Sequence, residues 1–320
     1  MSDEAELSDP PTRAAKRRQP QPRRAPRLEV NGWINLDKPV GVTSTQAVAQ
    51  LKYLLNAKKV GHAGTLDPLA SGVLPIALGE ATKTVPIVQD GTKAYQFTVR
   101  WGEETDTDDA EGRIVANSER RPSREAIEAA LPAFVGVISQ TPPMFSAIRI
   151  AGERAYDLAR GGETFEIAAR EIVIHRLQLV DAGRDEARFE AECGKGAYVR
   201  ALGRDLGRML GCHGHIVSLR RTRVGPFAAA RGAALDALRE DPAALAAALL
   251  PVEAGLTELP RLAVDRNGAA TLRRGQKLLL RGADAPVGGQ AYATCFGAPI
   301  AFGVVEDGYF VSTRVFNLPG

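Results

Sequence analysis

The sequence predicts a protein of the α+β class with a small β-rich region at its C-terminal end. Segments with strand alternation and segments with helical spacing are mixed along the chain, without the regular βαβ rhythm of a parallel sheet. The composition changes again after an alanine-rich stretch at 242–250. With 320 residues, 44% of them hydrophobic and 25% charged, the chain can bury a sizeable core and is long enough for two domains.

Prolines, glycines and a helix-capping residue predict the first elements. Residues 1–28 contain five prolines and almost no large apolar side chains, so we expect a flexible tail. Residues 33–36 have the pattern of a strand, and a turn follows at 38–41. Thr43 or Ser44 is placed to cap a helix over 46–55. The segment 61–75 is dense in Gly and Pro, which predicts a loop.

Alternation and helical spacing predict the remaining elements. Strands are expected at 94–101, 171–180 and 187–193, and helices at 125–134, 153–160 and 199–210. From about residue 261 the chain becomes Gly-rich, with strand-like runs at 291–296, 300–305 and 309–314. A β-domain of this size buries little core alone, so we expect it to pack against the main domain. The predicted domains are therefore 1–28, 29–258 and 259–320.

Composition excludes several classes of protein. No stretch approaches 18 consecutive apolar residues, which argues against a membrane-spanning helix, and the first residues lack the apolar core of a secretion signal. Three scattered cysteines do not make a disulfide framework. We expect a soluble cytoplasmic protein. The net charge of the chain, +3, equals the net charge of residues 1–28, so the rest of the chain is formally neutral. A surface that binds polyanions there requires the positive side chains to be gathered on one face.

Motifs for common cofactors are missing or incomplete. The sequence has no P-loop and no Gly-rich dinucleotide fingerprint. The cluster Cys212-His213-Gly214-His215 lacks the spacing of a structural zinc site, with only Cys193 nearby as a fourth ligand. The acidic run 103–111 has its glycine at the wrong offset for a calcium loop. The sequence therefore predicts neither metal nor cofactor.

A basic stretch between residues 195 and 231 contains eight Lys or Arg and one acid. Arg200, Arg204 and Arg208 are spaced to share one face of the helix expected there. Arg220, Arg221 and Arg223 follow on a predicted strand. Clustered guanidinium groups suit phosphate binding and favour a nucleic-acid surface, whereas a solvated face with scattered ion pairs is the alternative.

The loop 61–72 is the second candidate for function. Asp67-Pro68 is a common turn starter, and His62 is an ordinary loop residue. A carboxylate acts as nucleophile or base when a cation keeps it ionised in a dry pocket. Arg200 is a candidate for that cation, but the residues alone do not place the two groups together.

The string GHAGTLDPLASGVLPIALGEATK, at 61–83, resembles the signature loop of the TruB family of tRNA pseudouridine-55 synthases. Four further segments agree in order: LDKPVGVTS at 36–44, WGEETDTDDAEG at 101–112, QTPPMFSAIRIAGERAYDLARGG at 140–162 and GKGAYVRALGRDLG at 194–207. The resemblance covers about residues 30–320. It implies a mixed or antiparallel pseudouridine-synthase sheet with flanking helices, and a C-terminal RNA-binding domain similar to PUA domains.

The resemblance also implies roles for individual residues. The catalytic aspartate of the family falls on Asp67, its pairing arginine on Arg200, and a tyrosine that stacks on the target uracil, suspected in proton abstraction, on Tyr95. Five residues are expected to bind substrate. His62 is expected to meet the opened T-loop, and Tyr95, Tyr198 and Leu219 are expected to line the pocket. Lys38 is expected in a loop or in contact with the RNA backbone.

The implied reaction breaks the N1–C1′ bond of a uridine, turns the base and rejoins it through C5. The target base must leave its stack, so the site needs a ring to receive it. No cofactor is required, and the expected partner is tRNA, bound by a monomer without membrane or obligatory protein partner. Attack at C1′, attack at C6 and a glycal route stay open. The other hypotheses are an RNA chaperone, a guide-dependent enzyme acting on ribosomal RNA, and an enzyme on small metabolites.

Overall fold

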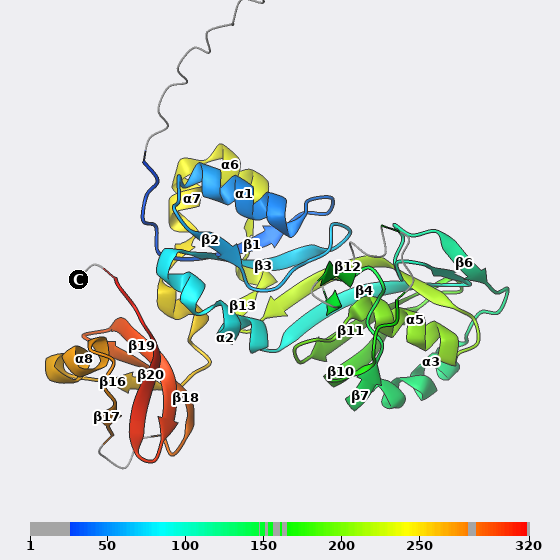
Figure 1. Cartoon of the computed structure of the whole chain (residues 1–320). Coiled ribbons are helices and arrows are strands. Elements are labelled where there is room, and N and C mark those ends of the chain that lie inside the picture. Colours follow the sequence, from blue (N-terminus) through cyan, green and yellow to red (C-terminus); the bar gives the residue numbers. More distant parts are fainter. Residues whose placement is uncertain are drawn as a thin grey trace, which may run out of the picture.

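The main domain is organised around an 11-stranded mixed sheet, and a separate five-stranded sheet forms the C-terminal part (Figure 1). This computed structural model describes residues 26–146, 148–150, 153–155, 161, 165–280 and 286–318. The long path of the main sheet is β14-β1-β3-β12-β4-β11-β10-β7, with β2, β13 and β15 pairing at its sides. The α+β prediction is confirmed.

The strands of the main sheet are β1 (Gly32–Lys38), β2 (Val60–His62), β3 (Ser71–Leu78), β4 (Lys93–Trp101), β7 (Gly136–Gln140), β10 (Arg170–Ala182), β11 (Glu186–Cys193), β12 (Gly214–Val224), β13 (Phe227–Ala228), β14 (Ala233–Ala234) and β15 (Leu249–Leu250). Two short pairs lie outside it: β5 (Glu103–Thr105) with β6 (Ile114–Asn117), and β8 (Arg149–Ile150) with β9 (Glu153–Arg154). The C-terminal sheet comprises β16 (Arg261–Ala263), β17 (Leu278–Leu279), β18 (Gly289–Cys295), β19 (Ala298–Glu306) and β20 (Tyr309–Val315).

The α-helices are α1 (Ser44–Leu54), α2 (Val85–Asp90), α3 (Arg124–Ala130), α5 (Val199–Met209), α6 (Leu235–Glu240), α7 (Pro242–Ala247) and α8 (Arg266–Arg273). In α1, Thr43 is the N-cap: its side chain accepts from the Gln46 amide while the Gln46 side chain accepts from the Thr43 amide. Among the described residues, no helix is long and apolar enough to cross a membrane.

Strand β4 and helix α5 make the core that supports the site. Phe97, Val99 and Trp101 alternate on the buried face of β4. Gly203 lets α5 lie close to this face, because a Cβ at that position would meet the Ile216 side chain at 2.8 Å. The side chain of Tyr95 extends the same alternation, so it lies on the same face of β4 and packs against the core.

Three predicted boundaries differ from the structure. Residues 71–75 belong to β3 and not to a loop. Pro75 is tolerated there because the neighbours on that side of β3 change from β12, at Gly72, to β2, at Ile76. Glu153 and Arg154 form β9 where a helix was predicted, and residues 156–160 of that helix lie outside the described residues. Residues 26–28 of the expected tail are bound to the domain: the Leu28 amide donates to the Asn56 carbonyl at 2.8 Å.

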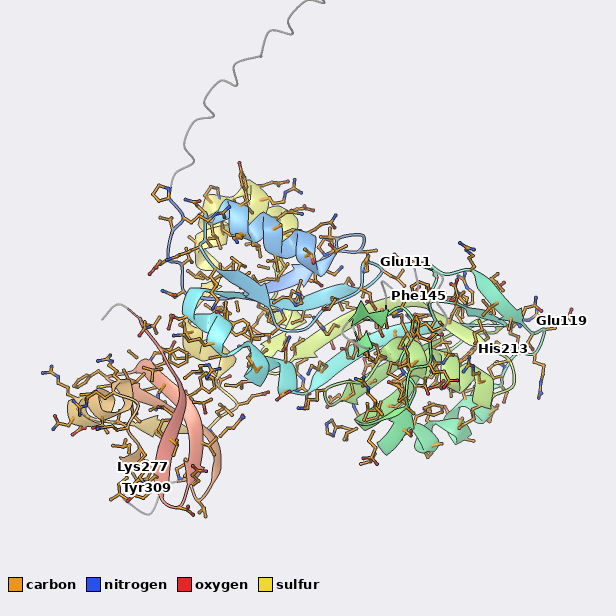
Figure 2. The ribbon with its side chains drawn as sticks, viewed as in Figure 1. Glu111, Glu119, Phe145, His213, Lys277 and Tyr309 are labelled. Carbon is orange, nitrogen blue, oxygen red and sulfur yellow. The ribbon has the colours of Figure 1, made fainter. Side chains whose placement is uncertain are left out.

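The C-terminal sheet packs against the main domain, as its small size predicted. Tyr292, Phe302 and Phe316 join one apolar cluster with Trp33 and Phe227 of the main sheet. At the opposite end of this sheet, the Lys277 ammonium lies 4.2 Å from the centre of the Tyr309 ring (Figure 2).

Candidate active site

Asp67 lies in the irregular segment between β2 and β3, and the residues around it are held by buried hydrogen bonds. The Ser44 hydroxyl donates to the Leu66 carbonyl and accepts from the Leu66 amide, both at 2.9 Å. The Pro68 carbonyl accepts from the Gly41 amide at 2.8 Å. Because both neighbours of Asp67 are fixed, its carboxylate is presented from a rigid segment although that segment has no regular structure.

Arg221 of β12 holds the other half of this segment. Its guanidinium is buried and donates to three backbone carbonyls: Gly64 at 3.0 Å, Thr65 at 3.1 Å and Val73 at 2.8 Å. The geometry uses the fixed fork of arginine donors, which the single head group of lysine does not reproduce. Arg221 therefore ties the Asp67 segment to the central strand of the sheet.

The Asp67 carboxylate meets Arg200, the second residue of α5. Arg200 Nε lies 3.0 Å from Asp67 Oδ2, and the Arg200 side chain is only 7% exposed. Its other nitrogens donate to the Thr107 and Phe145 carbonyls, both at 2.9 Å, and Nη1 lies 3.5 Å from the Asp109 carboxylate. A guanidinium with all its nitrogens engaged is a fixed positive charge beside a half-exposed carboxylate. That arrangement gives the Asp67 carboxylate a charge-assisted contact in a fixed direction.

Two tyrosines lie beside this pair. Tyr95 is partly buried on β4, in register with Arg221 of β12, and burial raises the pKa of its phenol to about 12. Tyr198 is the residue before α5. Its backbone amide donates to the Gln140 side chain, and its carbonyl accepts from the same side chain. Burial raises the pKa of Tyr198 as well. Both rings therefore carry their protons at neutral pH.

Leu219 and His62 lie on strands next to Arg221 and the Asp67 segment. Leu219 is 7% exposed and pairs with Phe97 across β12 and β4, two residues before Arg221 and so on the same face of β12. His62 ends β2, where burial and the Arg221 charge lower the pKa of its imidazole. A neutral imidazole at this place is a hydrogen-bonding group and not a cation.

Lys38 requires a correction. We expected a loop or RNA-backbone contact, but Lys38 is fully buried at the end of β1. Its ammonium donates to the carbonyls of Pro39 at 2.9 Å and Val42 at 2.7 Å. Burial lowers its pKa to about 8, and the Asp67 charge acts in the opposite direction. Lys38 supports the turn that accompanies the Asp67 segment, and its ammonium does not face solvent.

The basic stretch also differs from its prediction, because carboxylates from distant segments neutralise it. Arg204 pairs with Asp108 and Asp205, and Arg208 pairs with Glu104. The remaining ion pairs are Lys195 with Asp90, Arg220 with Asp37, and Arg223 with Glu192. The acidic run 103–111 thus supplies partners for α5: Arg200 and Arg204 are buried in ion pairs, and Arg208, which is 53% exposed, is paired with Glu104.

The sequence reasoning missed three residues that shape the site. Arg221 was assigned to a general basic strand, although its position two residues after Leu219 places it on the same face. Gln140 and Asp109 lie in the quoted motifs at 140–162 and 101–112, but nothing local predicts their partners, since each acts on a residue far away in the chain. Among the described residues, no group of three His, Cys, Asp or Glu could hold a metal ion.

Two family models match this chain. One describes the N-terminal domain of the TruB family of pseudouridylate synthases and matches residues 52–199. The other describes the C-terminal domain of tRNA pseudouridylate synthase B and matches residues 200–257. Together they cover the segments that contribute Asp67, Tyr95, Arg200 and Leu219.

Known proteins are similar over nearly the whole length. The chain is 62% identical over 306 residues to tRNA pseudouridine synthase B of Bradyrhizobium diazoefficiens, covering 93% of this chain and 89% of the relative. It is 59% identical over 309 residues to the protein of that name from Rhodopseudomonas palustris, covering 94% and 84%. Among solved structures it is similar to a chain of a Cbf5–Nop10–Gar1 complex, at 26% identity and a TM-score of 0.69, covering 89% of this chain and 84% of that one.

Proposed function

Because the chain belongs to the TruB family of pseudouridylate synthases, we propose that it converts one uridine of tRNA, at position 55 in the T-loop, to pseudouridine. The observation that carries this proposal is the Asp67 carboxylate, fixed on both sides by its anchored segment and held 3.0 Å from the buried Arg200 guanidinium.

In the proposed reaction the uridine leaves its stack and enters the site with its base against the Tyr95 ring. Unstacking costs a few kcal/mol, which contacts with the ring and the apolar wall at Leu219 offset. Tyr198 completes the enclosure on the α5 side. His62, kept neutral by its surroundings, is placed to hydrogen-bond the opened loop.

Asp67 then assists the cleavage of the N1–C1′ bond. Its negative charge is suited to attack C1′ or C6, or to stabilise the positive charge that develops on the sugar along a glycal route. After the base turns, C5 bonds to C1′ and loses its proton to solvent, and N1, which carried no proton in uridine, takes one up, so the product is an isomer of the substrate. Since the pKa of Tyr95 is about 12, its hydroxyl is neutral at rest, which favours stacking and hydrogen bonding over the role of a resting base.

The test is tritium release from tRNA labelled at C5 of uridine, with wild type and Asp67→Asn compared at matched RNA occupancy. We expect release by wild type from a single T-loop uridine, no release by Asp67→Asn, and affinities within about threefold of each other. Asp185→Asn is the matched control, because the Asp185 side chain is 61% exposed and, within the described part of the chain, forms its ion pair with Arg121 alone. Equal release by wild type and Asp67→Asn would refute the assignment of Asp67.

A guide-dependent enzyme is the second candidate, favoured by the similarity to a chain of an H/ACA RNP bound to a substrate RNA containing 2′-deoxyuridine. That chain shares 25% identity and a TM-score of 0.69, with 90% of this chain and 85% of that one covered. The two candidates differ in one readout. A stand-alone cytoplasmic monomer acts on naked tRNA, whereas a guide-dependent enzyme binds RNA and releases tritium only after partner RNA and proteins are added.

A further inference from the structure

Arg204 lies one helical turn after Arg200 on α5 and has no part in the proposed reaction. It is 6% exposed, and its nitrogens reach three acceptors. Nη1 meets the Asp108 carboxylate at 2.8 Å, Nη2 donates to the Thr141 carbonyl at 2.7 Å, and Nε meets Asp205 at 2.8 Å. Asp108 and Thr141 belong to segments that are distant in sequence, and both segments cross α5 at this turn.

The same two segments supply the acceptors that hold Arg200. Thr107 and Asp109 flank Asp108 in the acidic segment, and the Phe145 carbonyl follows Thr141 in the segment after β7. Figure 2 shows Phe145 and Glu111, one from each segment, on the side of the domain where they approach α5. The position of the Arg200 guanidinium therefore depends on the distance of both segments from the helix.

We propose that Arg204 is a positioning residue for Arg200: by clamping Asp108 and Thr141 to α5, it fixes the two segments whose oxygens aim the Arg200 guanidinium at Asp67. The predicted effect on turnover rests on the proposed function. The predicted link between Arg204 and the position of Arg200 does not depend on the proposed function.

Two features of the acidic segment support the need for a clamp. Asp108 has a φ of +61°, a backbone conformation that non-glycine residues rarely adopt and that requires support from its surroundings. Burial also raises the pKa of Asp108 to about 6, and the Arg204 charge acts against that shift. Without Arg204, this carboxyl would be a poor anchor for the turn that presents the Thr107 carbonyl.

A double-mutant cycle on single-turnover tritium release at saturating tRNA tests the proposal. We expect Arg204→Gln to slow the rate by at least tenfold, with tRNA affinity within about threefold of wild type. In the Arg200→Gln background, Arg204→Gln should slow the rate by less than threefold, because the residue through which it acts is gone. Effects that multiply, or an Arg204→Gln rate within twofold of wild type, would overturn the proposal.

Arg208→Gln is the matched control: it removes the ion pair between the next turn of α5 and the buried Glu104 of the same acidic run, but it leaves in place Arg204 and the oxygens that hold Arg200. Its rate should stay within twofold of wild type. Arg204→Gln/Asp108→Asn, which removes the orphaned carboxylate, should recover thermal stability but not rate. Recovery of both would assign Arg204 to folding alone.

A readout in the free protein separates this proposal from the proposed function. In a ¹⁵N-arginine spectrum, the Nε–H signal of Arg200, identified by its loss in Arg200→Lys, should exchange slowly in wild type and Arg208→Gln. It should broaden or shift in Arg204→Lys, which keeps the charge and also serves if Arg204→Gln does not fold. An unchanged signal in Arg204→Lys refutes the clamp whatever the turnover. An inactive wild type whose signal responds to Arg204→Lys refutes the proposed function and keeps the clamp.

Discussion

Replacing Arg221 with methionine should loosen the Asp67 segment and lower both stability and turnover. The three carbonyls that accept from Arg221, those of Gly64, Thr65 and Val73, are bonded at 2.8–3.1 Å. A buried acceptor that loses its donor costs about 1–3 kcal/mol. Counting the lower limit for each carbonyl, we expect Arg221→Met to lose about 3 kcal/mol of unfolding free energy.

The loss of turnover follows from position. A misplacement of about 1 Å of a reacting group costs on the order of 100-fold in rate, so we expect that reduction at saturating tRNA. Urea unfolding followed by circular dichroism measures the first effect, and tritium release measures the second. Arg221→Lys should fall between wild type and methionine, because one ammonium replaces a fork of donors.

Arg223→Met is the control on the same strand. Arg223 is 35% exposed, and among the residues that the structure describes its side chain pairs with Glu192 alone, at 3.3 Å. Its removal should therefore cost less than about 1 kcal/mol and leave turnover unchanged. If Arg221→Met unfolds within about 1 kcal/mol of wild type and keeps turnover within threefold, the anchoring argument is refuted.

Three further outcomes are expected. Burial lowers the pKa of Lys38 from 10.5 to about 8, so between these pH values the unfolded chain binds more protons than the folded one and the free energy of unfolding rises with pH. Urea titrations of Lys38→Met should therefore show a rise between pH 7.5 and 10 that is smaller than the wild-type rise by roughly 2 kcal/mol. An identical rise in both proteins would contradict this. The ratio of the wild-type rate to the Tyr95→Phe rate should stay constant from pH 7 to 10, because the pKa of Tyr95 is about 12 and the phenol stays protonated over this range. A tenfold change in this ratio per pH unit would indicate that the phenolate acts as a base. Deleting residues 1–25, which stops before the anchored Leu28, should lower tRNA affinity and the steepness of its salt dependence more than turnover, and an unchanged steepness would refute a role for the tail.

Local sequence determined most of the elements. The N-cap and the alternation along β4 depend on neighbours a few residues away: Thr43, one of the two expected caps, is the N-cap, and the alternation is found where expected. The boundary at β3 was wrong because Pro75 is acceptable only where one side of the strand changes partner, which is a property of the sheet and not of the local sequence.

The candidate site divides in the same way. Asp67, Tyr198 and Arg200 lie in motifs that are long enough to identify from sequence, whereas Tyr95 and Leu219 were assigned by the resemblance outside those motifs; the structure gathers all five around β4, β12 and α5. Their roles in the reaction stay predictions until the variants are measured. Lys38 lay in such a motif too, yet its burial assigns it to the support of a turn.

The sequence by itself determined the fold class, the family resemblance and the residue types at the reacting centre, because these are written in contiguous motifs and short-range periodicity. Only the tertiary structure decided which charged side chains are neutralised by partners from other segments. The basic stretch 195–231 resembles a polyanion surface in one dimension, yet most of its guanidinium groups meet carboxylates or carbonyls brought from other segments. Electrostatic interactions act through space over a few ångströms, so which charges cancel is a property of the packed chain and not of their order in the sequence.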